Sequence, residues 1–291
     1  MNEDQLAEVA SSPDRRKAIE AVSGGNVNVG NATYLSDSYK NALTDAIRFY
    51  QNEFKVSPHA NVRSFVDSFT PDELGDIDPR TRGMTTVNPD RTGQHDIALD
   101  DLTSGNEEKA EEETAEASET GWHPKNSIGI ANVPVHEFGH AIAGMLFEDN
   151  ANEDRKLSGY SEKNDQTKVV KDALRDIGAD VSDEGIEISS FGPFKEGLSR
   201  HTKKLSKNYD IARDAVKEIS DYALTNPAEA IAESLVDYYY NRDNAASLSK
   251  AIVNRLKSEG SMYGIKQTGA VDLAPSADNL LSNLRRYRVI Q

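Results

Sequence analysis

The 291-residue sequence contains no cysteine, which excludes a disulfide framework, a thiolate nucleophile and a cysteine-type zinc site. Any metal would have to be held by His, Asp or Glu side chains. Basic residues are also scarce, since 33 Lys and Arg stand against 49 Asp and Glu, for a formal net charge of −16. Nucleic acids and anionic membranes reward clustered Lys and Arg, so we expect neither as a partner.

Long apolar runs are missing as well. The most apolar window, residues 128–147, is interrupted by His136, Glu137 and His140, which argues against a membrane span. The first ten residues are acidic and lack the continuous apolar stretch of a signal peptide. We therefore expect a protein made in the cytoplasm without a signal peptide.

Composition divides the chain into one main domain and two flanking segments. Gly and Asn residues cluster near the N-terminus in a pattern typical of linkers, so we predict a tail or linker over residues 1–33. The main domain is expected over residues 34–260, followed by a C-terminal extension over residues 261–291. Residues 105–120 contain seven Glu and are low in complexity. They favour a solvated acidic loop, with an acidic lid or autoinhibitory segment as the alternative.

The spacing of apolar residues predicts a helix, then short strands, then mostly helices, which is an α+β fold. Strand regions are expected over residues 61–69 and 83–100, the second as a hairpin about Asn88-Pro89-Asp90. The predicted helices span residues 36–53 with Ser36 or Asp37 as N-cap, 133–147, 165–177 with Gly178 as stop, 210–219, 227–240 and 245–257.

One short stretch carries a metal-binding pattern, His136-Glu137-Phe138-Gly139-His140. On a helix, histidines four residues apart lie on one face and can reach a single cation such as zinc. Glu137 lies one step round the helix, where it can take a proton from a metal-bound water. Two satisfied histidines on a core helix are the structural alternative. A buried Glu between them would then be costly, because it would have no charge to serve.

Zinc hydrolases hold their ion with three protein ligands, so the motif needs a third. The three-histidine extension is excluded because Ala143 and Leu146 stand at the positions of its Gly and its His. A downstream carboxylate is the better candidate. Glu229 and Glu233 are four residues apart on an otherwise small and apolar helix face. Buried acids call for a cation or for hydrogen-bond donors, although a solvated acidic stripe with Asp237 gives the same spacing.

These segments resemble the zincin-like (gluzincin) metalloproteases of the anthrax lethal factor type, a domain also found in phage minor head and capsid-associated proteins. In that family a Tyr lies seven residues before the ligand Glu, and a second Glu lies four residues after it. Tyr222, Glu229 and Glu233 match those positions. The stretch Gly121–Pro124 is similar to the phage-type versions. The matching motifs cover a small part of the chain, and Ser234-Leu235 departs from the small-then-aromatic pair of the toxin.

The resemblance implies a zinc-dependent endopeptidase with a zincin-like fold. Zn²⁺ would be bound by His136, His140 and Glu229, and would lower the pKa of bound water toward about 7. Glu137 would act as general base and then pass the proton to the leaving amine. Tyr222 would donate a hydrogen bond to the oxyanion formed during peptide hydrolysis.

Three further residues or segments are expected to support this site. Glu233 would orient a ligand imidazole through its other ring nitrogen. Such sites usually bind the peptide by strand addition to an edge strand, for which Asp96–Leu99 is the candidate. Trp122 and His123 are candidates for shaping the cleft, with simple packing of the Trp as the alternative.

The favoured function is a zinc endopeptidase acting on a protein or peptide substrate. Its expected setting is a phage or prophage particle, where phage head or other virion proteins would be its partners. One alternative is a structural virion or interaction protein that keeps zinc without turnover, and another is a toxin-like effector protease. An intact Glu137 and Tyr222 favour an enzyme, because a structural metal site needs neither.

Overall fold

The computed structural model describes residues 15–29, 35–87, 94–148, 162–179 and 206–262. These residues form a mixed α+β fold that is mostly helical and holds a small four-stranded sheet, which confirms the α+β part of the prediction. The chain divides into two compact units. The first comprises Met1–Glu113, Gly129–Asp149 and Ile265–Gln291, and the second comprises Thr114–Ile128 and Asn150–Gly264. The predicted C-terminal extension falls almost wholly outside the described residues.

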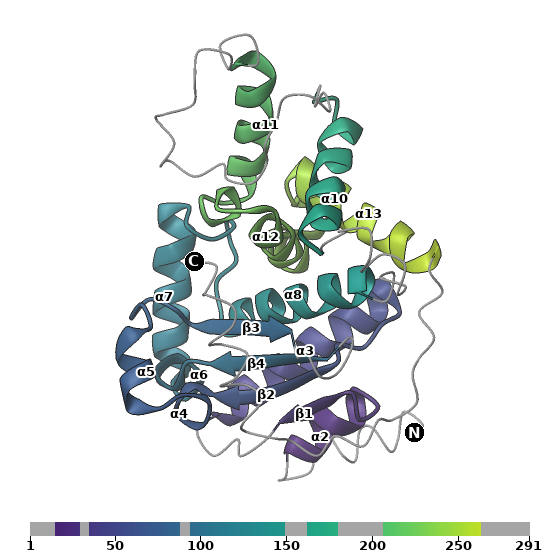
Figure 1. Ribbon diagram of the computed structural model, residues 1–291. Helices are drawn as coiled ribbons and strands as arrows, with labels where there is room; N and C mark the ends of the chain where they lie inside the picture. Colours follow the sequence, from purple (N-terminus) through teal and green to yellow (C-terminus); the bar gives the residue numbers. More distant parts are fainter. Residues whose placement is uncertain (1–14, 30–34, 88–93, 149–161, 180–205, 263–291) are drawn as a thin grey trace. The chain divides into compact units, whose positions relative to one another are not determined.

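The first unit is built on the sheet (Figure 1). Its strands run in the order β1-β2-β4-β3, with β1, β2 and β4 parallel and β3 antiparallel to β4. Helix α8 packs against β3 and α3, and α3 also packs against α2. The elements of this unit, with α7 running on into the second, are α2 Arg15–Val22, β1 Val27–Val29, α3 Asp37–Phe54, β2 Ala60–Ser64, α4 Phe65–Ser68, α5 Pro71–Asp76, β3 Gly83–Val87, β4 His95–Leu99, α6 Asp101–Ser104, α7 Glu107–Thr120 and α8 Asn132–Glu148.

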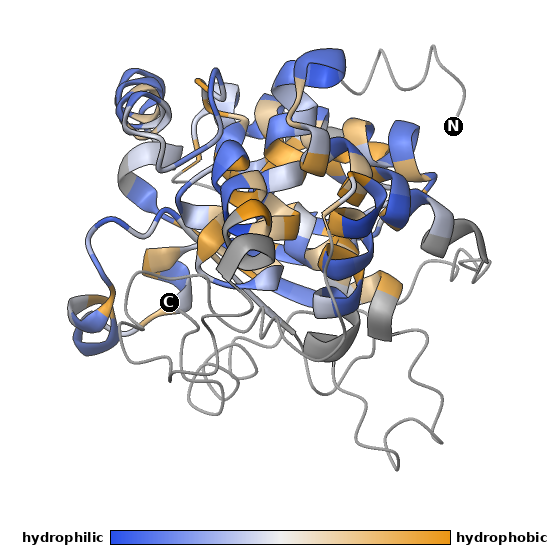
Figure 2. Ribbon diagram, turned by 90° about the horizontal axis from the view of Figure 1, so that it is seen from above, coloured by the Kyte–Doolittle hydropathy of each residue, from blue (hydrophilic) through white to orange (hydrophobic). Residues whose placement is uncertain are grey.

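The second unit is a group of helices about α12, which packs against α10, α11, α13 and η3. Helices α12 and α13 pack against each other, and both bury apolar side chains, among them Leu235 and Val236 of α12 and Ile252 and Leu256 of α13. Figure 2 shows apolar and hydrophilic residues alternating along single helices, as expected for helices that bury one face. Its further elements are α10 Glu162–Asp176, α11 Ser206–Ile219, η3 Tyr222–Leu224, α12 Pro227–Asn241, η4 Arg242–Asn244 and α13 Ser247–Met262.

The predicted helices are confirmed, with ends that differ by a few residues. Ser36 is the N-cap of α3, and its side chain accepts a hydrogen bond from the backbone of Tyr39. Helix α10 ends before Gly178, whose φ of 85° lies in the left-handed region that favours glycine. The strands β3 and β4 pair as the predicted hairpin does, and its turn at residues 88–93 lies outside the described residues. None of the helices in the described part of the chain is long and apolar enough to cross a membrane.

Residues 15–29, predicted as part of a tail or linker, instead form α2 and β1. Ile19 and Val27 are fully buried, and Val29 is nearly so. Strand β1 pairs in parallel with β2, and the Ser23 hydroxyl accepts a hydrogen bond from the Val27 backbone at 3.0 Å. A strand of three residues beside a glycine pair is too short to show a periodic pattern, and this explains why the sequence indicated a linker.

The acidic segment 105–120, predicted as a loop, contains the helix α7. Glu, Ala and Lys are strong helix formers, and acids in the first turn suit the helix dipole. The Asn106 side chain accepts a hydrogen bond from the Lys109 backbone at 3.1 Å, which caps the helix start. Ala110 and Thr114, four residues apart, are buried. The segment was predicted as a loop because it has few apolar residues, and the buried face of the helix is narrow.

The proposed peptide-binding edge at Asp96–Leu99 is also wrong. That segment belongs to β4, which lies between β2 and β3 and is hydrogen-bonded on both sides. All five residues of β4 are buried, although two of them are His95 and Asp96, as expected for a central strand covered on both faces. Within the described residues, β3 is the edge strand on the side of the sheet that α8 contacts.

Candidate metal centre

Helix α8 brings the two motif histidines together as their spacing predicts. Phe138 and Ile142 are fully buried and hold the helix in the core of the first unit. The Nε2 atoms of His136 and His140 lie 3.1 Å apart, and the two rings meet at 78°. Two nitrogen ligands of a tetrahedral zinc, each about 2.0–2.1 Å from the ion, lie about 3.3 Å apart. The separation of the two imidazoles therefore suits a shared cation.

Glu137 follows His136 in the same helix, and its side chain packs against strand β3. Its side chain is buried, and its Oε2 accepts a hydrogen bond from the Thr85 hydroxyl at 2.5 Å. The same hydroxyl lies 3.2 Å from the backbone carbonyl oxygen of Glu137. A Cβ at Gly83 would lie 2.5 Å from Oε1 of Glu137, so a side chain there would force the carboxylate to shift. The start of β3 is therefore shaped to receive this carboxylate.

A second glycine lets α8 lie close to the sheet. A Cβ at Gly144 would come within 2.2 Å of Nε2 of His95, a buried residue of β4. His95 has no ligand-like spacing in the sequence, and the structure places it against α8 as part of the core. Because Gly144 has no side chain, helix α8 can lie close to strand β4.

The structure groups Glu229 with the two motif histidines. His136, His140 and Glu229 each offer one ligand atom, and these atoms all lie within 4.8 Å of one another. His136 and Glu229 are buried and His140 is half-buried. Among the described residues, this group could hold a metal ion. The donor set of two imidazoles and one carboxylate is one that zinc takes in hydrolases.

Glu229 lies in the first turn of α12, at a well-formed helix start. Asn226 is the N-cap, and its side chain accepts a hydrogen bond from the Glu229 backbone at 3.0 Å. Pro227 follows at the first helical position, where its missing N–H costs nothing. An acid in the first turn also suits the positive end of the helix dipole. The local sequence thus fixes where the helix begins and so where this carboxylate stands.

Glu233, one turn further along α12, is fully buried and held by its own unit. Its two oxygens lie 3.1 and 3.2 Å from Nδ1 of His123, and the Ser220 hydroxyl donates to Oε2 at 2.9 Å. The prediction that it orients a ligand imidazole stays a prediction. The sequence indicated His123 only as a candidate for shaping the cleft and did not predict its pairing with Glu233. Ser220 gave no signal in the sequence.

Tyr222 is fixed by the segment that contains Trp122. The Tyr222 and Trp122 rings stack with centroids 5.2 Å apart and planes 27° apart, while His123 meets the Tyr222 ring edge-on at 6.0 Å. The backbone of Tyr222 donates to the Trp122 carbonyl at 3.2 Å, and that of Asp221 donates to the Gly121 carbonyl at 2.7 Å. Trp122 is still 48% exposed, so it packs on one face and leaves much of its ring open.

Comparisons with protein families, with curated proteins and with solved structures found no match to this chain.

Proposed function

We propose that this protein is a zinc-dependent endopeptidase with a zincin-like catalytic domain. The observation that carries the proposal is the group formed by His136, His140 and Glu229, with Glu137 beside it in the same helix as the histidines. A cation held only for stability needs no carboxylate beside its ligands, whereas Glu137 is buried directly after His136, where a general base would stand. The resemblance to the gluzincins of the lethal factor type points the same way.

The mechanism assigns each side chain one task. When bound, Zn²⁺ supplies a Lewis acid that lowers the pKa of water to about 7 and polarises a peptide carbonyl. Glu137 accepts the proton of the attacking water and passes it to the leaving amine. Tyr222 donates its hydroxyl hydrogen to the oxyanion as charge develops there. His136, His140 and Glu229 would hold the ion.

The substrate in this proposal is an extended peptide that pairs with an edge strand. Strand β3 takes the place of Asp96–Leu99 in that role, because it is the edge strand on the side that α8 contacts. We propose a phage or prophage particle as the setting, with head or other virion proteins as substrates. That part rests on the resemblance of the motifs alone.

The proposal is tested with wild-type protein and Glu137→Gln. We expect about one zinc per chain in both, and a loss of about 10²–10⁴-fold in peptide cleavage for the variant. Glu116→Gln, which changes an exposed acid on α7, is the matched control and should cleave like wild type. Zinc binding by a wild-type protein that cleaves nothing in a broad peptide library would favour a structural zinc site and contradict the proposal.

A further inference from the structure

We infer that Thr85 is a positioning residue for the Glu137 carboxylate, and that an ion-pair anchor at the start of β3 holds Thr85 in place. The inference rests on the proposed peptidase function for its effect on turnover. The contact itself is a property of the first unit and can be tested without catalysis.

The contact selects one oxygen of the carboxylate. The Thr85 hydroxyl has a single hydrogen, and the shorter of its two approaches, 2.5 Å against 3.2 Å, is to Oε2 of Glu137. Oε1 faces Gly83, where a side chain would collide with it. The hydroxyl and the bare glycine together define a rotamer for Glu137.

Alternation along β3 supplies an internal contrast. Side chains of a strand point to opposite faces in turn, so Thr85 faces α8 and Thr86 does not. The Thr86 hydroxyl instead approaches the backbone carbonyl of Asp96 in β4 at 3.4 Å. The two threonines have the same chemistry, and only one of them reaches Glu137. Replacing each in turn separates the contact from the general needs of the strand.

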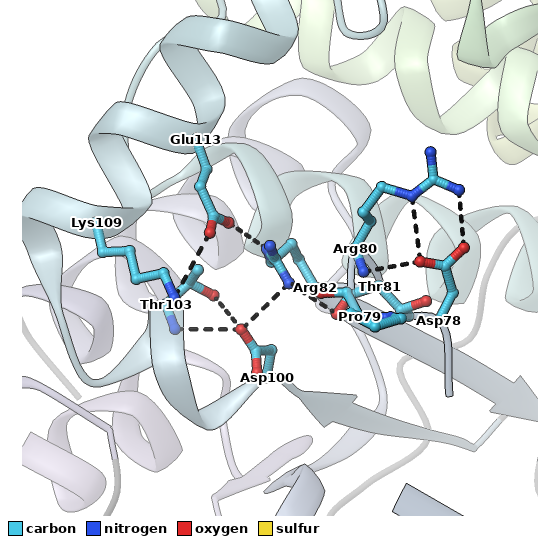
Figure 3. Close-up of polar contacts among 9 residues, drawn as sticks. All are labelled: Asp78, Pro79, Arg80, Thr81, Arg82, Asp100, Thr103, Lys109 and Glu113. Atoms are coloured by element: carbon cyan, nitrogen blue, oxygen red, sulfur yellow. Dashed lines mark hydrogen bonds and ion pairs between the residues drawn. The ribbon is translucent and has the colours of Figure 1, made fainter. Parts of the chain in front are cut away.

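The start of β3 is anchored by a cluster of charged residues (Figure 3). Arg82, directly before Gly83, forms an ion pair with Glu113 of α7 and lies 3.7 Å from a carboxylate oxygen of Asp100. It also donates to the Pro79 carbonyl at 2.7 Å. The backbone of Asp100 donates to the Arg82 carbonyl at 2.9 Å, which extends the pairing of β3 with β4. Arg82 is thus held on several sides.

The acidic helix α7 takes part in this anchor through Glu113. Glu113 pairs with Arg82 and lies 3.8 Å from Lys109, whereas the neighbouring Glu112 is exposed. The side chain of Arg82 is about one quarter exposed, so the pair is partly shielded from water. One of the seven acids in the low-complexity segment therefore helps to fix the strand that meets Glu137.

A general base works only from a narrow range of positions, and a displacement of about 1 Å can cost about 100-fold in rate. Thr85→Val keeps the size and branching of the side chain but removes the hydroxyl. We expect kcat to fall about 10–100-fold with KM and zinc content unchanged. Thr85→Ser, which restores the donor, should recover most of the loss. Thr86→Val removes a hydroxyl from the same strand without touching Glu137, so its fall in kcat should be clearly smaller, and equal kcat values for Thr85→Val and Thr86→Val would overturn the inference.

A double-mutant cycle on the metal-free protein tests the contact independently of activity. Thr85→Val, Glu137→Ala and the double variant are compared by thermal unfolding. If the contact exists, the Tm shift of the double variant will differ from the sum of the two single shifts. The difference expected for a typical hydrogen bond in a chain of this size is about 2–4 °C. Additive shifts would contradict the inference whatever the protein catalyses. Non-additive shifts in a protein without peptidase activity would instead leave the contact standing and refute the proposed function.

The anchor has its own matched pair. Glu113→Gln should lower kcat in the same direction as Thr85→Val, by a smaller factor, with KM unchanged. Glu112→Gln removes the same charge from the next residue of α7 and should have no effect. Equal behaviour of the two variants would show that α7 does not position β3.

Discussion

Helices α8 and α12 each present two potential metal ligands four residues apart, yet they arrange them differently. In α8, His136 and His140 turn their Nε2 atoms toward one another at 3.1 Å. In α12, Glu229 groups with those histidines, while Glu233 is bound by His123 and Ser220 of its own unit. The same spacing thus brings both histidines of α8 to one place, whereas the two glutamates of α12 have different partners.

The difference follows from what surrounds each helix. The histidines of α8 share a face, and their helix is seated by apolar packing and by Gly144 against the sheet. A fully buried carboxylate such as Glu233 instead requires donors, and an imidazole and a hydroxyl supply them. Spacing on a helix therefore identifies candidate ligands, and the partners in the fold decide which candidate is available to a metal.

The largest expected effect distinguishes the two acids of α12. Substitution of a residue that only supports a metal ligand weakens metal binding by about 10–100-fold. Glu229→Gln should weaken zinc binding by more than that, because it removes a charged ligand. Glu233→Gln should keep zinc but lower the free energy of unfolding by about 1–3 kcal/mol, through its bonds to His123 and Ser220. Zinc titration and thermal unfolding measure the two effects. Loss of zinc in Glu233→Gln alone would reverse the comparison.

A smaller effect concerns Tyr222, which is held by Trp122 and His123 in the second unit. Tyr222→Phe removes only the hydroxyl and keeps the ring that stacks on Trp122. We expect kcat to fall about 10²–10³-fold, the usual cost of losing one oxyanion donor, with zinc content unchanged. Tyr239→Phe on α12 is the control. If Tyr222→Phe keeps full activity, the hydroxyl has no part in the chemistry.

The smallest effect is on stability and tests how α8 is seated. Gly144→Ala places a Cβ against the His95 ring, so we expect the free energy of unfolding to drop by about 1–3 kcal/mol. Gly75→Ala in α5 meets nothing within 4 Å and should be neutral or stabilise by up to about 1 kcal/mol. Chemical denaturation of both variants gives the values. Similar values for the two would mean that α8 can shift without cost.

Much of the fold could be predicted because the sequence signals of an amphipathic helix involve residues that are close together in the chain. Each signal lies within a few residues of the helix it belongs to, as the Ser36 cap does for α3 and the Gly178 stop does for α10. The motif in α8 was visible for the same reason. Strand β1 and the central position of β4 were not, because both depend on pairing with β2, far away in the sequence.

The supporting residues of the candidate site lie beyond sequence reasoning for a related reason. Thr85 and Glu137 are 52 residues apart, and His123 and Glu233 are 110 residues apart. No periodicity joins such positions, and a lone Thr or Ser has many uses. The acidic segment shows the opposite error, since its composition resembled a loop while Ala110 and Thr114 defined a helix face.

We propose that two imidazoles of α8 and one carboxylate of α12 bind the same ion. X-ray absorption spectroscopy of the zinc-loaded protein tests it most directly, because it counts and identifies the ligands. We expect a four-coordinate ion with two imidazole nitrogens at about 2.0–2.1 Å, and oxygen ligands that change in Glu229→Gln. A six-coordinate ion bound by oxygen alone, or a spectrum of Glu229→Gln identical to that of wild type, would contradict it.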